Sequence, residues 1–120
     1  MAEGCNLSSE LRVFLHHLYE LEKGVRKMVL FTMSAENEIW AVNRLKKRKL
    51  AYHVQRVNER KVNLFFGREE CVAVIKSFLD RPLNALTAEE DFVLGMLLGY
   101  DLCDQCKRFC SMKKRVRLAM

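Results

Sequence analysis

Three cysteines near the C-terminal end of the chain carry the most distinctive chemical spacing. Cys103, Cys106 and Cys110 form a C-x2-C-x3-C pattern, and closely spaced thiolates are ligands of zinc and of iron–sulfur clusters. Such a site needs a fourth ligand, for which Cys71 is the only distant thiol unless Cys5 folds back. The alternative is a small apolar stripe on a helix, because cysteine is among the residue types that are buried most often.

Helix geometry favours the stripe over the metal site. A rise of about 1.5 Å per residue separates Cys103 from Cys110 by roughly 10 Å, whereas zinc holds its sulfur ligands within about 4 Å of one another. The chain has five cysteines, an odd number, and its first residues do not resemble an export signal. We therefore predict reduced thiols that bind no metal, and we expect no cofactor.

The histidines offer a second possible metal site. His16 and His17 would point to opposite faces of a strand, so at most one of them could meet His53, with Glu20 on the face of His16. Half-buried histidines that hydrogen-bond at a sheet face or a dimer seam are the simpler interpretation. The sequence contains no glycine-rich phosphate loop, nucleophile elbow or HExxH pattern. It therefore identifies no catalytic residue and does not favour an enzyme.

The charged residues are segregated along the chain, which has a net charge of +6. Residues 41–68 hold nine basic and one acidic side chain, whereas residues 69–104 hold two basic and eight acidic ones. Such segregation is typical of a surface that attracts a partner of opposite charge, although a solvated helix end is the plain alternative. The candidates for binding an acidic partner are Arg44, Lys46, Lys47, Arg48 and Lys49.

Nucleic acid is a weaker candidate for this partner. Phosphate contacts require basic runs such as residues 44–49 and 113–117, but strand binding also uses aromatic side chains for stacking, and only Tyr52 and His53 lie near the first run. No helix-turn-helix or RNP pattern is present. The longest apolar stretch, Phe92–Tyr100, is too short for a membrane span of about 18 residues or more. We expect a cytoplasmic protein that does not contact a membrane.

Two helices and a hairpin must position the first basic run. The pattern predicts a helix over residues 34–49, begun by Ser34 as N-cap, and a second helix over residues 68–79. Between them, residues 51–57 and 61–66 alternate as strands around a turn at Asn58-Glu59-Arg60. The expected inward residues of the helices are Ile39, Val42 and Leu45 in the first, with Trp40 off this stripe, and Cys71, Val74, Ile75 and Phe78 in the second.

The cysteine pattern lies on a C-terminal helical region. Thr87 and Glu90 form a capping box that starts a helix, and Gly99-Tyr100-Asp101 predicts a break before the cysteines. Residues 11–20 fit helical spacing and strand composition equally well.

Four segments, in order, resemble a small bacterial family filed as domain of unknown function 2023. They are Phe14–Glu20, Lys23–Arg26, Asn63–Gly67 and Glu90–Asp101, and the resemblance covers about residues 11–110. It implies an α+β fold with three strands, about five helices and a homodimer, and it favours a strand at residues 11–20. It implies no activity, cofactor or catalytic residue.

We expect a single α+β domain over residues 1–120, with a small three-stranded, mainly antiparallel sheet packed against about five α-helices. Its ordered core spans about residues 9–111, and a basic tail follows at 112–120. The leading functional hypothesis is a non-enzymatic homodimer that binds an acidic protein through its basic surface. The alternatives are a redox or metal-binding protein that uses Cys103, Cys106 and Cys110, and a nucleic-acid-binding protein.

Overall fold

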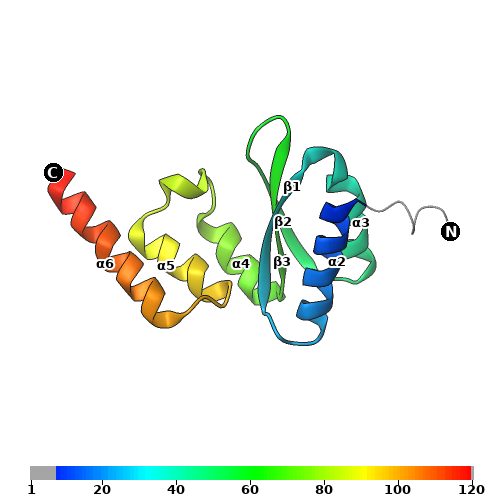
Figure 1. Cartoon of the computed structure of the whole chain (residues 1–120), viewed down its shortest axis with the longest axis horizontal. Coiled ribbons are helices and arrows are strands. Elements are labelled where there is room, and N and C mark those ends of the chain that lie inside the picture. Colours follow the sequence, from blue (N-terminus) through cyan, green and yellow to red (C-terminus); the bar gives the residue numbers. More distant parts are fainter. Residues whose placement is uncertain (1–7, 120) are drawn as a thin grey trace.

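A three-stranded antiparallel sheet with helices on both faces forms the framework of the protein (Figure 1). The structure, a computed structural model, describes residues 8–119. It confirms the expected α+β architecture with three strands and five α-helices. In chain order the elements are α2 (Ser9–Glu22), β1 (Met28–Ser34), the 3-10 helix η1 (Ala35–Asn37), α3 (Glu38–Lys47), β2 (Ala51–Arg56), β3 (Lys61–Gly67), α4 (Glu69–Phe78), η2 (Leu83–Ala85), α5 (Ala88–Leu97) and α6 (Leu102–Ala119).

Residues 11–20 form a helix, so the expectation of a strand there is wrong. The hydroxyl of Ser8 accepts a hydrogen bond from the Leu11 N–H and caps α2. The third strand is instead β1, which follows α2 after a short turn. Helical spacing decides the outcome, because it puts all the buried side chains of the segment on one face: Leu11, Phe14, Leu18 and Leu21.

The last strand in the chain, β3, lies in the centre of the sheet, between β1 and β2. Both neighbours pair with it in antiparallel fashion, and Gly67 lies opposite both Met28 and Ala51. The predicted hairpin is confirmed as β2 and β3. At Gly67 a Cβ atom would lie 2.4 Å from the carbonyl oxygen of Lys27, so the close approach of the two backbones requires glycine.

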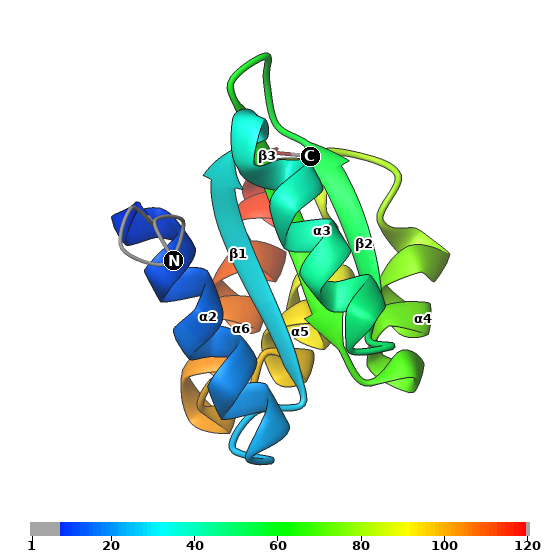
Figure 2. The same cartoon turned by 90° about the vertical axis from the view of Figure 1, so that its right-hand side faces the viewer.

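Two apolar clusters hold the helices against the two faces of the sheet. Helices α2 and α3 cover one face (Figure 2), where Phe14 packs on Phe66 with ring centroids 5.3 Å apart. Helices α4 and α5 lie over the opposite face, where Phe65 is fully buried. Because β3 is covered on both sides, its consecutive residues from Val62 to Gly67 are all buried.

Helix α3 begins later than predicted. Ser34 is the last residue of β1, makes no side-chain cap bond and is followed by η1. Its N–H and hydroxyl instead donate to the carboxylate of Glu10 on α2, which also accepts a bond of 2.6 Å from the Asn37 amide. This contact with α2 replaces the N-cap bond that the sequence predicts for Ser34.

The inward faces of α3 and α4 also differ from the predicted stripes. Ile39 is 75% exposed, whereas the Trp40 ring packs edge-on against Phe14 with centroids 6.0 Å apart. On α4, Val74 is exposed and Val72 is buried. The observed stripes are rotated because the strand surface, rather than the most apolar edge of each helix, determines which residues are covered. The buried residues are Ala41 and Leu45 on α3 and Val72 and Ile75 on α4, with Cys71 and Phe78 partly buried.

Helices α5 and α6 form a hairpin that extends away from the sheet (Figure 1). The capping box of Thr87 and Glu90 and the break at Gly99, which has φ +80°, are confirmed. Residues 112–119, expected as a tail, form the last turns of α6. The molecule is elongated, with extents of 58 × 32 × 24 Å. No helix within residues 8–119 has the length and apolar character that crossing a membrane requires.

Candidate functional site

The predicted basic run lies at the end of α3 and in the turn that follows it. Arg44 stacks over the Trp40 ring at 4.6 Å, and Arg48 pairs with Glu22 of α2 at 2.5 Å. The first contact lies within α3, whereas the second joins the end of α3 to α2, so both arginines already have partners in the chain. Three exposed lysines have no ion-pair partner within the described chain and remain available to a ligand: Lys46, Lys47 and Lys49.

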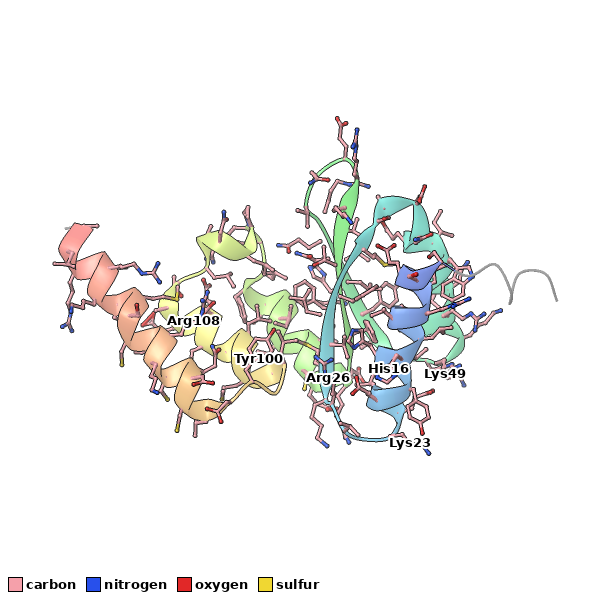
Figure 3. The ribbon with its side chains drawn as sticks, in the orientation of Figure 1. His16, Lys23, Arg26, Lys49, Tyr100 and Arg108 are labelled. Carbon is pink, nitrogen blue, oxygen red and sulfur yellow. The ribbon has the colours of Figure 1, made fainter. Side chains whose placement is uncertain are left out.

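Lys49 has a left-handed backbone, with φ +57°. This conformation ends α3 and is usually adopted by glycine. The Leu50 N–H then bonds the Leu45 carbonyl at 3.0 Å, and the chain turns directly into β2. The turn presents the Lys49 side chain to solvent on the side remote from the α5–α6 hairpin (Figure 3).

The fold adds basic residues from three other places to this end of the molecule. The Arg68 N–H bonds the Lys27 carbonyl at 3.0 Å, so the residue before β1 and the residue after β3 lie side by side. Lys76 comes from the last turn of α4. We call the exposed cations gathered here the basic end: Lys27, Lys46, Lys47, Lys49, Arg68 and Lys76.

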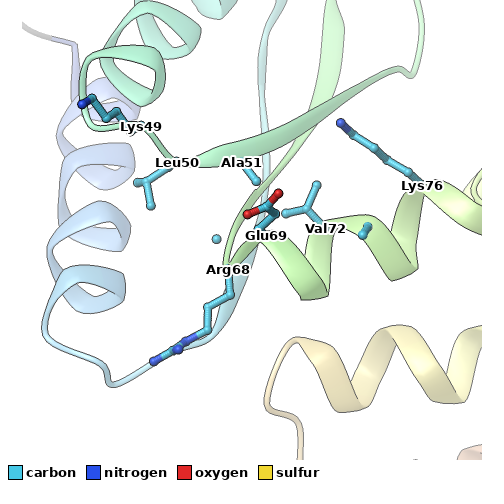
Figure 4. Close-up of a pocket in the computed structure, with 9 residues that line it drawn as sticks. Lys49, Leu50, Ala51, Arg68, Glu69, Val72 and Lys76 are labelled. Atoms are coloured by element: carbon cyan, nitrogen blue, oxygen red, sulfur yellow. The ribbon is translucent and has the colours of Figure 1, made fainter.

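A shallow depression of about 590 Å³ is lined by three of these cations, Lys49, Arg68 and Lys76 (Figure 4). Leu50, Ala51, Val72 and Ala73 give it an apolar lining. In Figure 4 the charged groups of Lys49, Arg68 and Lys76 lie well apart from one another, while the Glu69 carboxylate lies in the middle. Separated cations around an apolar patch with a central carboxylate do not fit a compact anion such as phosphate. They fit an extended surface that carries separated acidic groups.

Of the basic end, the sequence identified only the contiguous run. Lys27 precedes Arg68 by 41 residues, and the two meet only because β1 pairs with β3; Lys76 follows Arg68 by eight residues, on α4. The one usable signal was Gly67, since a glycine between a strand and a helix indicates a close backbone approach. It was not sufficient to identify the segment it approaches.

A comparison with protein families identifies relatives of the whole domain. The family model described as protein of unknown function DUF2023 matches residues 12–112. The chain is a member of the DUF2023 family. This agrees with the resemblance of its four segments, and the family description assigns no activity. No curated protein matches the chain.

The cysteine trio of this DUF2023 protein lies on the outer side of α6. Cys103, Cys106 and Cys110 are all exposed, so the interpretation as a buried stripe is wrong. The side of α6 that packs against α5 carries Gln105 and Phe109 instead, and the Gln105 side chain fills the space left by Gly95. Within residues 8–119 no group of three or more His, Cys, Asp or Glu side chains is arranged to hold a metal ion.

The histidines of the DUF2023 protein lie on opposite faces of the sheet. His17 on α2 contacts Phe31, and its Nδ1 lies 3.1 Å from Nη1 of Arg26. His53 on β2 lies beside Phe65, on the face covered by α4. Burial, followed by Arg26 for His17 and by Lys76 for His53, lowers the pKa of both imidazoles. His17 and His53 are therefore half-buried as expected, whereas His16 on α2 is exposed.

Proposed function

We propose that this protein is a non-enzymatic, homodimeric protein-binding or regulatory module of the bacterial cytoplasm that docks an acidic protein on its basic end. The observation that carries the proposal is the convergence of exposed cations from separate elements around one apolar depression. Lys46, Lys47 and Lys49 lack ion pairs within the described residues. Cations without intramolecular partners lose less on binding an acidic surface than cations that must first break a salt bridge.

Each part of the basic end has a separate role in this proposal. The lysines of the α3 turn attract the partner and orient it, because rim charges act mainly on association rate and register. The apolar lining, with Leu50 and Val72, supplies the surface that is removed from water. Glu69 in the centre repels a partner whose acidic groups are concentrated at one point.

The test is a pull-down from a bacterial lysate, run in parallel with and without nuclease treatment, with three tagged baits. The first is the wild-type protein, and the second carries Lys46→Glu, Lys47→Glu and Lys49→Glu. The third is the matched control, which carries the same number of reversals on exposed residues of α6: Lys107→Glu, Lys114→Glu and Arg117→Glu.

We expect the wild type and the α6 control to retain the same acidic protein, and the α3-turn variant to lose it. If both variants lost the acidic protein equally, net charge alone would account for its capture, which would contradict the proposed site. Capture that disappears after nuclease treatment would instead identify a nucleic acid as the ligand.

The homodimer is supported by surfaces that one chain leaves uncovered. Each outer strand, β1 and β2, pairs on one side only within residues 8–119. Exposed apolar side chains also remain on α6, where Leu102 is 58% and Leu118 79% exposed. Twofold pairing would cover such surface. Light scattering at micromolar concentration should show a particle of twice the 14.1 kDa chain mass; a monomer would contradict the proposal.

A further inference from the structure

The outer side of α6 presents three thiols that the basic end does not involve. Cys103, Cys106 and Cys110 are exposed and lie within about 60° of one another around the helix axis. A thiol must reach solvent to exchange with a disulfide in solution. All three sulfurs meet this requirement, whereas Cys71 on α4 is half-buried against the apolar cluster.

Two disulfides are possible on this face, Cys103–Cys106 and Cys106–Cys110, and they differ in where their cysteines lie along α6. Cys103 is the second residue of α6, where helix geometry leaves the backbone N–H groups of the first turn without intrahelical partners. Asp101 holds this turn in place, since its carboxylate accepts from the Asp104 N–H at 3.0 Å and its carbonyl accepts from the Gln105 N–H at 3.0 Å. Cys110, in contrast, lies in the middle of the 18-residue helix.

The geometry of a disulfide favours the Cys103–Cys106 pair over the Cys106–Cys110 pair. Residues three or four apart on a helix have Cβ atoms about 5–6 Å apart, but a disulfide needs about 3.5–4.5 Å. Closing either pair therefore distorts the backbone. Cys103 can move if the two hydrogen bonds that Asp101 accepts in the first turn break. Moving Cys110 would instead break backbone hydrogen bonds of α6 on both sides of it. The chain turns at Gly99, three residues before α6 begins, so Cys103 lies close to the end of the helix.

We infer that Cys103 and Cys106 form a redox-responsive dithiol that closes to a disulfide by exchange with a low-molecular-weight disulfide. The thiolate of Cys103 attacks one sulfur of the reagent, whose other sulfur leaves as a thiolate. The thiolate of Cys106 then attacks the Cys103 sulfur and displaces the second reagent thiol. Two protein thiols are oxidised by two electrons and one reagent disulfide is reduced to two thiols.

The charge near the pair is mixed, because Asp101 and Asp104 flank Cys103. Lys107 lies one turn after Cys103 on the same side of α6, is exposed and has no ion pair within the described residues. Closure would also loosen the first turn of α6, next to the site where Gln105 packs on Gly95. The redox state of the pair would thus alter the packing at the start of the α5–α6 hairpin.

The experiment treats the reduced full-length protein with oxidised glutathione and follows mass and peptide maps over time. In the wild type the peptide that holds Cys103 and Cys106 should pass through a mixed disulfide and end at a mass lower by two hydrogen atoms, with Cys103 linked to Cys106. Cys103→Ser and Cys106→Ser should stop at the mixed disulfide. Cys110→Ser, the matched control on the same helix face, should close at the wild-type rate.

A second measurement distinguishes formation of the Cys103–Cys106 disulfide from a mixed disulfide on an exposed thiol. Far-ultraviolet circular dichroism should show a small loss of helix on oxidation of the wild type and of Cys110→Ser, reversed by dithiothreitol, and none in the other two variants. A map that links Cys106 to Cys110, a disulfide between two chains, or mixed disulfides alone in the wild type would overturn the inference. These outcomes do not depend on whether the basic end binds an acidic protein.

Discussion

The guanidinium of Arg81 donates two hydrogen bonds to the carboxylate of Glu90, at 2.5 and 2.8 Å. The same carboxylate accepts a bond of 2.9 Å from the Thr87 N–H, so it caps α5 and ties it to the segment after α4. The bonds from Arg81 first, and from Thr87 second, lower the pKa of Glu90 to about 2.

This relationship predicts a defined acid sensitivity. Glu90 in the unfolded chain binds its proton near the ordinary value of 4.5, more readily than in the folded protein. The stabilisation it provides is therefore complete above about pH 4.5 and is lost as the pH falls towards about 2. In Glu90→Gln the free energy of unfolding should therefore fall less between neutral and acidic pH than in the wild type, as measured by urea denaturation. Glu59→Gln, in the exposed hairpin turn, should keep the wild-type pH dependence.

Reversing Lys46, Lys47 and Lys49 to glutamate should leave the stability nearly unchanged. These exposed lysines make no ion pair within the described residues, and surface charges contribute about 0–1 kcal/mol each. Thermal denaturation of the triple variant should thus give a melting temperature close to that of the wild type. A large fall would show that the lysines are structural and would weaken the proposed docking surface.

Gly67→Ala should destabilise the protein more than Gly24→Ala. Both glycines have positive φ, but a Cβ at Gly67 would collide with the Lys27 backbone, whereas nothing lies within 4 Å of one at Gly24. Collision plus strain should cost roughly 2 kcal/mol or more, against about 1 kcal/mol for strain alone. Equal losses in chemical denaturation of the two variants would contradict the close approach of β3 and β1.

Asn63→Ala should also destabilise the fold. The buried Asn63 amide accepts from the Thr32 hydroxyl at 2.6 Å and donates to the Gln55 side chain at 2.9 Å, so one polar ladder joins all three strands. Removing the amide breaks both bonds, and because Thr32 is exposed and Gln55 half-buried, we expect a cost of about 1 kcal/mol, the net value of a hydrogen bond. Asn43→Ala, on the exposed side of α3, should cost little. Comparable denaturation midpoints for the two variants would show that water replaces the ladder.

Local signals gave reliable predictions where neighbouring residues determine the structure. The capping box of Thr87 and Glu90 and the hairpin turn at residues 58–60 depend on groups a few positions apart, and both were predicted. Residues 11–20 and β1 were not, because an apolar run becomes helix or strand according to what covers it. The helix at 11–20 covers one face of the sheet, whereas β1 is covered on both faces.

The site could be predicted only in part, for the same reason. The lysines of the α3 turn are contiguous, but their association with Lys27, Arg68 and Lys76 depends on strand pairing. The exposure of Cys106 could not be deduced from residue type, since on α6 a glutamine takes the buried position that cysteine usually prefers. Gln105 fits there because Gly95 leaves room for its side chain.

Helix α6 is joined to α5 through the turn at Gly99 and acts as a lever arm for the residues at its far end. Its pivot is the turn at Gly99, and Arg117 lies about 22 Å from the start of the helix at 1.5 Å per residue. A rotation of only about 10° at the pivot would displace Arg117 by about 4 Å, more than the reach of a hydrogen bond of roughly 3 Å. Asp91 opposes this rotation, because its carboxylate bonds Arg108 at 2.6 and 3.0 Å. This pair lies about 9 Å along the helix, and a second ion pair, between Lys113 and Glu89, lies about 16 Å along it, so both halves of α6 are tied to α5.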